Sequence, residues 1–98
     1  MIIHLHPQLR SDVLSVARSG DVLTINGVVI DFGAVPDGAD LPSSAIDTEW
    51  IVGVVRRVGG VLHIPLILPH GPDAGASVRF PDDIVDPPDG PVALPGAA

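Results

Sequence analysis

Cysteine and lysine are both missing from this 98-residue chain, which also has only one tryptophan, two phenylalanines and no tyrosine. Without cysteine there is no disulfide framework, no thiolate metal ligand and no thiol nucleophile. Five arginines against twelve acidic residues give a net charge of −7, which argues against a phosphate backbone as a partner. So few aromatic side chains also leave little surface on which bases would stack. We therefore expect no nucleic-acid partner.

Long apolar runs and targeting signals are missing as well. The densest apolar stretch, residues 49–70, is interrupted by arginines and glycines, whereas a membrane-spanning helix needs about 20 apolar residues. The N-terminal segment MIIHLHPQLR lacks the basic segment and long apolar stretch of a secretion signal, so we expect no membrane partner and a cytoplasmic protein. Glycine-rich phosphate loops and nucleophile elbows are absent too, and we predict no cofactor and no enzyme activity.

Turn-forming residues, in contrast, are abundant. Eleven prolines and eleven glycines separate short apolar runs, a pattern typical of an all-β meander. We predict one β domain over residues 1–98, in which an antiparallel meander of hairpins forms a small sandwich or open barrel, with long Pro/Gly-rich loops and little or no helix. Its expected parts are an N-terminal strand and three-stranded meander (1–33), a connector (34–48), a central hairpin (49–70), and a loop with an extended C-terminal tail (71–98).

The three-stranded meander follows from two turn signals. Ser19-Gly20 and Asn26-Gly27 both lie between alternating residues, where such dipeptides indicate tight hairpin turns. Pairing about the first turn sets Val16 opposite Leu23, and pairing about the second sets Leu23 opposite Ile30. The two turns therefore predict the same inward face, made of Leu14, Val16, Leu23, Ile25, Val28, Ile30 and Phe32.

The central hairpin contains the only tryptophan and two Val/Ile-rich runs around Gly59-Gly60. A two-residue turn there pairs Val58 with Val61, and Pro65 then falls at a hydrogen-bonded position where proline has no N–H to give. We expect either a bulge near Pro65 or a wider loop that makes this strand an edge. The predicted core-facing residues are Ile51, Gly53, Val55, Leu62, Ile64, Leu66 and Leu68.

The remaining segments give weaker signals. Residues 1–6 alternate as a short strand that Pro7 would end, residues 43–47 have room for one helical turn, and residues 78–80 suit a brief strand. The tail is predicted to be extended, with its last few residues loose, and to be pinned by Ile84, Val85, Val92 and Leu94.

The outward face of the central hairpin is also apolar, so its burial would require another layer or another chain. We therefore predict a partner-binding surface there, with arginines at the hairpin mouth contacting an acidic partner, although charges beside a turn also simply keep that end hydrated. The predicted partner-binding residues are Trp50, Val52, Val54, Arg56, Arg57 and Ile67.

The four histidines suggest an alternative, a small metal- or ligand-binding β-barrel. His4 and His6 form an H-x-H pair, which in a strand points both imidazoles to one side, and His63 or His70 would supply a further ligand. Without a complete ligand motif, purely structural histidines are the simpler interpretation.

Two further groups of polar residues could have either a chemical role or a purely structural one. His70 lies close to Asp73, as a general base paired with a carboxylate would. No nucleophile motif accompanies them, so a capped turn is the simpler interpretation. The four aspartates of the tail suit oxygen ligation of Ca²⁺, but their spacing matches no EF-hand loop and is equally typical of a solvated acidic segment. These aspartates are Asp82, Asp83, Asp86 and Asp89.

Four segments, VLTINGVVIDF, LPSSAIDTEWIVG, LILPHG and DGPVALP, resemble small uncharacterised proteins encoded in tailed-phage and prophage genomes near tail and tail-fibre genes. The similarity covers the chain from about Leu14 to Pro95. It implies a small structural or assembly-accessory component made in the cytoplasm of a bacterial host, and possible association with the virion. No catalytic or binding residue can be carried over from this group.

Together these observations predict a non-enzymatic protein that acts through protein–protein association. Its expected partners are itself, as a homo-oligomer, phage tail proteins, or both. An assembly chaperone that leaves before the particle matures is a third possibility, and sequence does not separate it from a component that stays.

Overall fold

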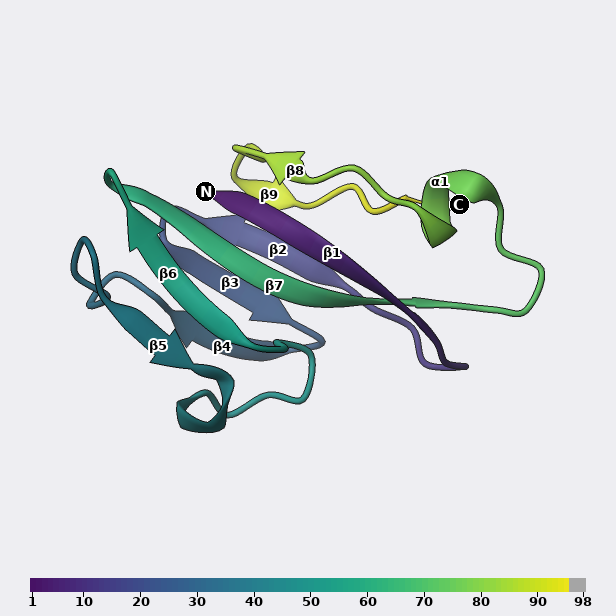
Figure 1. The fold of residues 1–98 in the computed structure, drawn as a ribbon, viewed down its shortest axis with the longest axis horizontal. Coiled ribbons are helices and arrows are strands. Elements are labelled where there is room, and N and C mark those ends of the chain that lie inside the picture. The colour runs from purple at the N-terminus through teal and green to yellow at the C-terminus, as the bar shows by residue number, and fades with distance from the viewer. Residues whose placement is uncertain (96–98) are drawn as a thin grey trace.

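The computed structural model describes residues 1–95, and their strands form two sheets stacked as a sandwich (Figure 1). The first sheet contains, in spatial order, β5 (Asp40–Pro42), β6 (Val54–Val58), β7 (Val61–His70), β1 (Ile2–Leu9) and β8 (Ile84–Val85). The second contains β4 (Val28–Asp31), β3 (Val22–Ile25), β2 (Val16–Ser19) and β9 (Gly90–Pro91). The helical segments are η1 (Ser43–Ala45) and α1 (Ala76–Arg79). The all-β prediction is confirmed, as a sandwich of open sheets and not a barrel.

The three-stranded meander is confirmed as β2, β3 and β4. At its second turn Ile25 pairs with Val28, while Asn26 and Gly27 both have positive φ, as a type I′ hairpin turn requires. Asn26 also ties down the chain before β2, because its Oδ1 accepts a hydrogen bond from the Ser15 N–H at 2.7 Å.

The first turn lies one residue later than predicted. Ser19 pairs with Val22, so the central residues are Gly20 and Asp21, and Val16 lies opposite Ile25 instead of Leu23. Gly20 has φ +59°, which suits the first central position of a type II′ turn. The shift changes each partner by two residues and so preserves the faces. Of the predicted inward face Val16, Leu23, Ile25 and Phe32 are buried, Leu14 and Ile30 pack partly against the core, and Val28 is exposed.

The central hairpin pairs Val58 with Val61 and Arg56 with His63, as predicted. Farther from the turn Ile51 lies opposite Leu66, so four residues of one chain segment face two of the other between these pairs. This is a bulge on the side opposite Pro65, and it removes the need for the proline N–H. β7 is nevertheless no edge strand, because β1 pairs along its other side.

β1 differs most from expectation. It pairs in parallel with β7 along its whole length, from Ile2 opposite His63 to Leu9 opposite His70, so it belongs with the central hairpin and not with the meander. Pro7 lies inside the strand, opposite Leu68, and does not end it. The two segments lie about sixty residues apart in sequence, and no local turn signal marks their pairing.

Several short elements also differ from prediction. The expected connector contains a strand, β5, and its predicted helical turn is η1. The expected brief strand at 78–80 is instead the end of α1 and its cap. The tail contributes a strand to each sheet, through β8 and β9. Val92 is buried and Ile84 and Leu94 pack partly, whereas Val85 is 69% exposed and is held by its strand pairing with Ile2. The predicted loose end extends over residues 96–98, which lie outside the described residues.

The core lies between the two sheets. Of the predicted inward residues of the central hairpin, Gly53 is exposed and the others are buried: Ile51, Val55, Leu62, Ile64, Leu66 and Leu68. Ile3 and Leu5 of β1 complete this layer, and Phe32 at the end of the meander is the largest fully buried side chain opposite it. Alternation along each strand then places the other side chains of the first sheet on its outer face.

Candidate functional site

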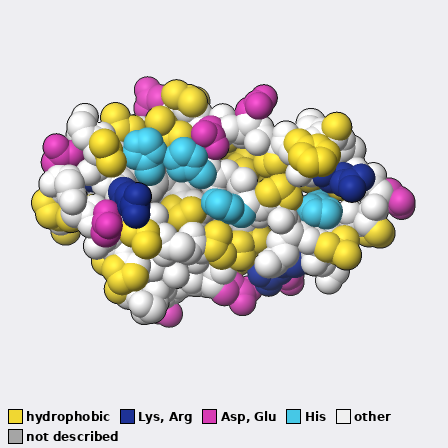
Figure 2. Space-filling model, viewed as in Figure 1, with side chains coloured by type: hydrophobic (Ala, Val, Ile, Leu, Met, Phe, Trp, Pro, Cys, Tyr) yellow, Lys and Arg dark blue, Asp and Glu magenta, His cyan; other side chains and the backbone are white. Residues whose placement is uncertain are grey.

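The outer face of the first sheet carries an open depression of about 520 Å³. Figure 2 shows histidine side chains gathered on the face that β1, β6 and β7 present to the viewer. We call the lining residues the outer-face site: His4, His6, Val54, Arg56, Val58, His63 and Pro65. The sequence predicted Val54 and Arg56 as part of an outward partner-binding surface, but not that β1 would add its histidines beside them.

The parallel register of β1 and β7 assembles this site. His4 lies opposite Pro65 and Ile2 opposite His63, so these residues share the outward side of two neighbouring strands. Arg56 lies opposite His63 on β6 and extends the same side. The site thus forms where β1, distant in sequence, pairs with the hairpin of β6 and β7.

His4 and His63 are in direct contact, with His4 Nε2 and His63 Nδ1 2.9 Å apart. Their ring planes differ by only 11°, while the ring centroids are 5.2 Å apart. The centroid separation exceeds the nitrogen separation by about one ring width, so the rings lie edge to edge in nearly one plane, with the two nitrogens facing each other. This is the geometry of an N–H···N hydrogen bond in which one ring donates and the other accepts.

Asp83 completes a three-residue chain. Its Oδ1 lies 3.1 Å from His4 Nδ1, on the side of the ring away from His63. Both partners are partly exposed, with 36% of the His4 side chain and 50% of the Asp83 side chain accessible. Sequence analysis grouped Asp83 only with the other tail aspartates, and nothing local in the sequence indicates that β8 would carry it to β1.

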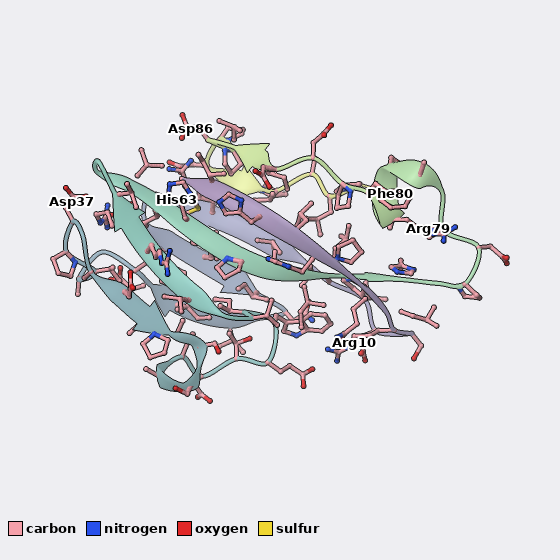
Figure 3. The ribbon with its side chains drawn as sticks, in the orientation of Figure 1. Arg10, Asp37, His63, Arg79, Phe80 and Asp86 are labelled. Atoms are coloured by element: carbon pink, nitrogen blue, oxygen red, sulfur yellow. The ribbon has the colours of Figure 1, made fainter. Side chains whose placement is uncertain are left out.

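The predicted partner-binding residues have three different environments. Trp50 and Ile67 are already buried within the chain, at 7% and 5% exposure, so neither needs a partner to cover it. The Arg10 guanidinium lies 4.4 Å from the Trp50 ring centroid in a cation–π contact (Figure 3 labels Arg10). Val52 is half-buried, while Val54 and Arg56 line the outer-face site.

Arg57 has an internal structural role, in contrast to its predicted contact with an acidic partner. Its side chain is 15% exposed and donates to the carbonyls of Val35 at 2.6 Å and Phe32 at 3.2 Å, and to Asp21 Oδ2 at 3.1 Å. Arg57 therefore ties β6 of one sheet to the meander of the other. Arg56, with its side chain 57% exposed, forms an ion pair with Asp40 at 3.3 Å.

The structure brings two of the four predicted metal-ligand histidines into contact but does not form a complete ligand set. His4 meets His63 and His6 lines the same depression, yet His70 hydrogen-bonds its own neighbour, with Nδ1 2.8 Å from the Gly71 carbonyl. Among residues 1–95 no group of three or more histidine or acidic side chains is arranged to hold a metal ion. The facing nitrogens of His4 and His63 point at each other and not at a common point.

The tail aspartates hold separate parts of the chain together instead of converging. Asp86 pairs with Arg18 at 2.9 Å and lies 3.8 Å from the Met1 amino group, and Asp89 accepts a hydrogen bond from the Gly20 N–H at 3.0 Å. The Arg18 guanidinium lowers the pKa of the Asp86 carboxyl below its usual range, with a further contribution from the Met1 amino group. The Arg10 guanidinium donates hydrogen bonds to the Asp12 and Glu49 carboxylates, and these bonds raise the pKa of Arg10, with Asp12 contributing most.

Comparison with protein-family models, with curated proteins and with solved structures gives no match to this chain. Across residues 1–95, none of the helices has the length and apolar character needed to traverse a bilayer.

Proposed function

We propose that this chain is a non-enzymatic association module whose docking surface is the outer-face site. The observation that carries the proposal is the composition of this sheet face. In a two-layer sandwich an outer face that meets water is expected to be polar, but here Val54, Val58 and Pro65 lie among the histidines. No segment of residues 1–95 forms a third layer over them.

The occupant we propose is a second copy of the chain. The chain has a net charge of −7, so most pairs of surfaces from two copies repel each other. On this face the Arg56 guanidinium is matched by Asp40, the apolar side chains carry no charge, and the Asp83 carboxylate is in contact with His4. Two copies of the face can therefore meet about a two-fold axis with little charge repulsion, as isologous dimers require.

The resemblance to tailed-phage and prophage proteins adds a context to this proposal. It favours a structural or assembly-accessory role in a bacterial host, with a tail protein as the larger partner on which the chain docks. A role as an assembly chaperone differs only in whether the protein stays in the finished particle.

Analytical ultracentrifugation over a range of concentrations tests the association. We expect reversible self-association of the native chain, and at least a tenfold weaker association for Val58→Arg, because the contact would place the new charge near its symmetry mate and near Arg56. Val29→Arg is the matched control, since Val29 is similarly exposed, at 67% against 58%, but lies on β4 of the other sheet. A native chain that stays monomeric at millimolar concentration, or equal effects of the two substitutions, would refute the docking surface.

A metal-binding function is the second candidate, favoured only by the gathering of His4, His6 and His63 in one depression. If the sandwich holds a resident ion, protein purified without a histidine tag contains near-stoichiometric metal, and a chelator lowers its melting temperature by linkage. Our proposal expects neither effect: sub-stoichiometric metal by elemental analysis and an unchanged melting temperature. Stoichiometric metal that stabilises the fold would reverse the order of the two candidates.

A further inference from the structure

We propose that Asp83, His4 and His63 form a proton relay that holds a single proton between its two rings and thereby makes the outer-face site sensitive to pH. The inference about the relay rests on geometry alone. Its consequence for association rests on the function proposed above.

The Asp83 carboxylate fixes the tautomer of His4. An ionised carboxylate is only an acceptor, so the 3.1 Å contact with Oδ1 requires a proton on His4 Nδ1. A neutral His4 then has a lone pair on Nε2, which faces His63 Nδ1 at 2.9 Å. His63 must therefore carry its proton on Nδ1 and donate it to His4. Asp83 thus determines the tautomer of a histidine that it does not touch.

One additional proton fits this arrangement. The charged His4 ring keeps its contact with Asp83 and donates from Nε2, and His63 reverses its role and accepts through Nδ1. The hydrogen bond between the rings survives, with its direction reversed. The net charge of the three side chains changes from −1 to 0.

A second additional proton does not fit. Both rings would then present N–H groups to each other across 2.9 Å, and two cations would lie side by side. Asp83 holds His4, so His63 is the ring that must turn away. The charged or ionisable groups around the pair are Asp83 before β8, His6 on β1, and Arg56 on β6, which lies directly across from His63 and is itself paired with Asp40 of β5.

The outer-face site would therefore change character in acid. While the rings share at most one additional proton they stay joined over an apolar floor, whereas after the second proton the site contains an opened pair of imidazolium groups. Turning His63 away rearranges the contact surface, and the two charged rings must lose water when a second copy covers them, so the self-association proposed above should weaken at acidic pH.

Nitrogen-15 NMR of the histidine side chains in the native chain tests the relay without any partner. We expect both His4 and His63 in the Nδ1–H tautomer at pH 8, and a scalar coupling across the hydrogen bond between His4 Nε2 and His63 Nδ1. This coupling should disappear in acid once both rings carry two protons. Nε2–H tautomers for both rings at pH 8, or no coupling at any pH, would overturn the proposal.

Asp83→Ala separates the relay from a merely structural contact. Without the carboxylate His4 is free to carry its proton on Nε2 and to donate to His63, so His63 should change to the Nε2–H tautomer although its own surroundings are unaltered. Asp82→Ala is the matched control, because Asp82 is an exposed neighbour outside the relay. A His63 tautomer that does not respond to Asp83→Ala would refute the relay.

The two proposals fail in different ways. If the coupling is present and no self-association occurs at any pH, the relay stands and the docking surface fails. If association occurs but is as strong at pH 5 as at pH 8 in a protein that shows the coupling, the docking surface stands and its control by the relay is refuted.

Discussion

Two adjacent arginines show how far the role of a residue depends on its direction from the strand. Arg56 and Arg57 are chemically identical neighbours on β6, but alternation sends them to opposite sides of the sheet. Arg56 points outward to the partly hydrated Asp40, where an ion pair is worth at most about 1 kcal/mol. Arg57 points inward and donates to three main-chain carbonyls and to Asp21. The sequence assigned one role to both.

Glutamine substitutions at the two positions should therefore differ in stability. Arg57→Gln should lower the free energy of unfolding by about 1.5 to 3 kcal/mol, because hydrogen bonds from a charged donor are lost and the carbonyls remain half-buried. Arg56→Gln should change it by no more than about 0.5 kcal/mol. Urea denaturation measures both values, and equal losses would contradict the internal role of Arg57.

Among the elements, the central hairpin shows that a local rule predicted where its regular strand pairing would break. Pro65 cannot donate in a regular ladder, and the chain opposite it accommodates this with a bulge between Ile51 and Arg56. Gly53 lies inside the bulge with φ +85°, and its carbonyl accepts a hydrogen bond from the Ser43 N–H at 2.8 Å. The bulge thus also fixes the start of η1 beside the sheet.

Gly53→Ala tests this element by backbone conformation alone. A Cβ at Gly53 would meet no atom within 4 Å, so the expected destabilisation of about 1 to 2 kcal/mol comes only from the positive φ. Gly71→Ala is the control, because that site is equally open and its φ lies outside the left-handed region. It should be neutral or slightly stabilising in thermal or urea melts. A neutral Gly53→Ala would show that the bulge relaxes easily.

At the scale of the whole molecule, the C-terminal tail fastens the two sheets to each other. β8 extends the first sheet beside β1, and β9 extends the second beside β2. Between them Asp86 pairs with Arg18 of β2 and approaches the Met1 amino group next to β1 (Figure 3). A segment whose sequence is typical of a solvated acidic tail is therefore part of both layers.

The Asp86 contact should make stability depend on pH in a defined direction. Since the Arg18 hydrogen bond lowers the pKa of Asp86 below 3.8, its usual value, the folded state is favoured above that pH. This contribution is lost as the pH falls through the lowered pKa of the folded state. Asp86→Asn keeps a residue that tolerates the positive φ of 47° at this position.

Melting temperatures of the native chain and Asp86→Asn, measured between pH 7 and pH 2, check this expectation. The native chain should melt higher at pH 7, and the difference should close below pH 3.8. Asp82→Asn, at an exposed neighbouring site, should show no such closing gap. A constant difference for Asp86→Asn across the whole range would contradict the ion pair as its cause.

What the sequence by itself determined was local. Turn dipeptides and period-two alternation specified the meander, the Gly59-Gly60 hairpin and most of the core, since each of these depends on residues within about ten positions of one another. The first turn lies one residue later than predicted, but this moves each cross-strand partner by two residues, so the same side chains still face the core. The glycine pair and Asn26-Gly27 adopt the positive φ that their turns require.

Only the tertiary structure decided which distant segments meet. No local turn signal indicates that β1 pairs in parallel with β7 or that the tail returns to both sheets. Each of these pairings closes a long loop against a shared core. The candidate site lies at those junctions, where β1 supplies His4, β7 supplies His63 and the tail supplies Asp83. Pairings across such sequence distances leave no periodic signal, so the histidines were visible in the sequence while their contact was not.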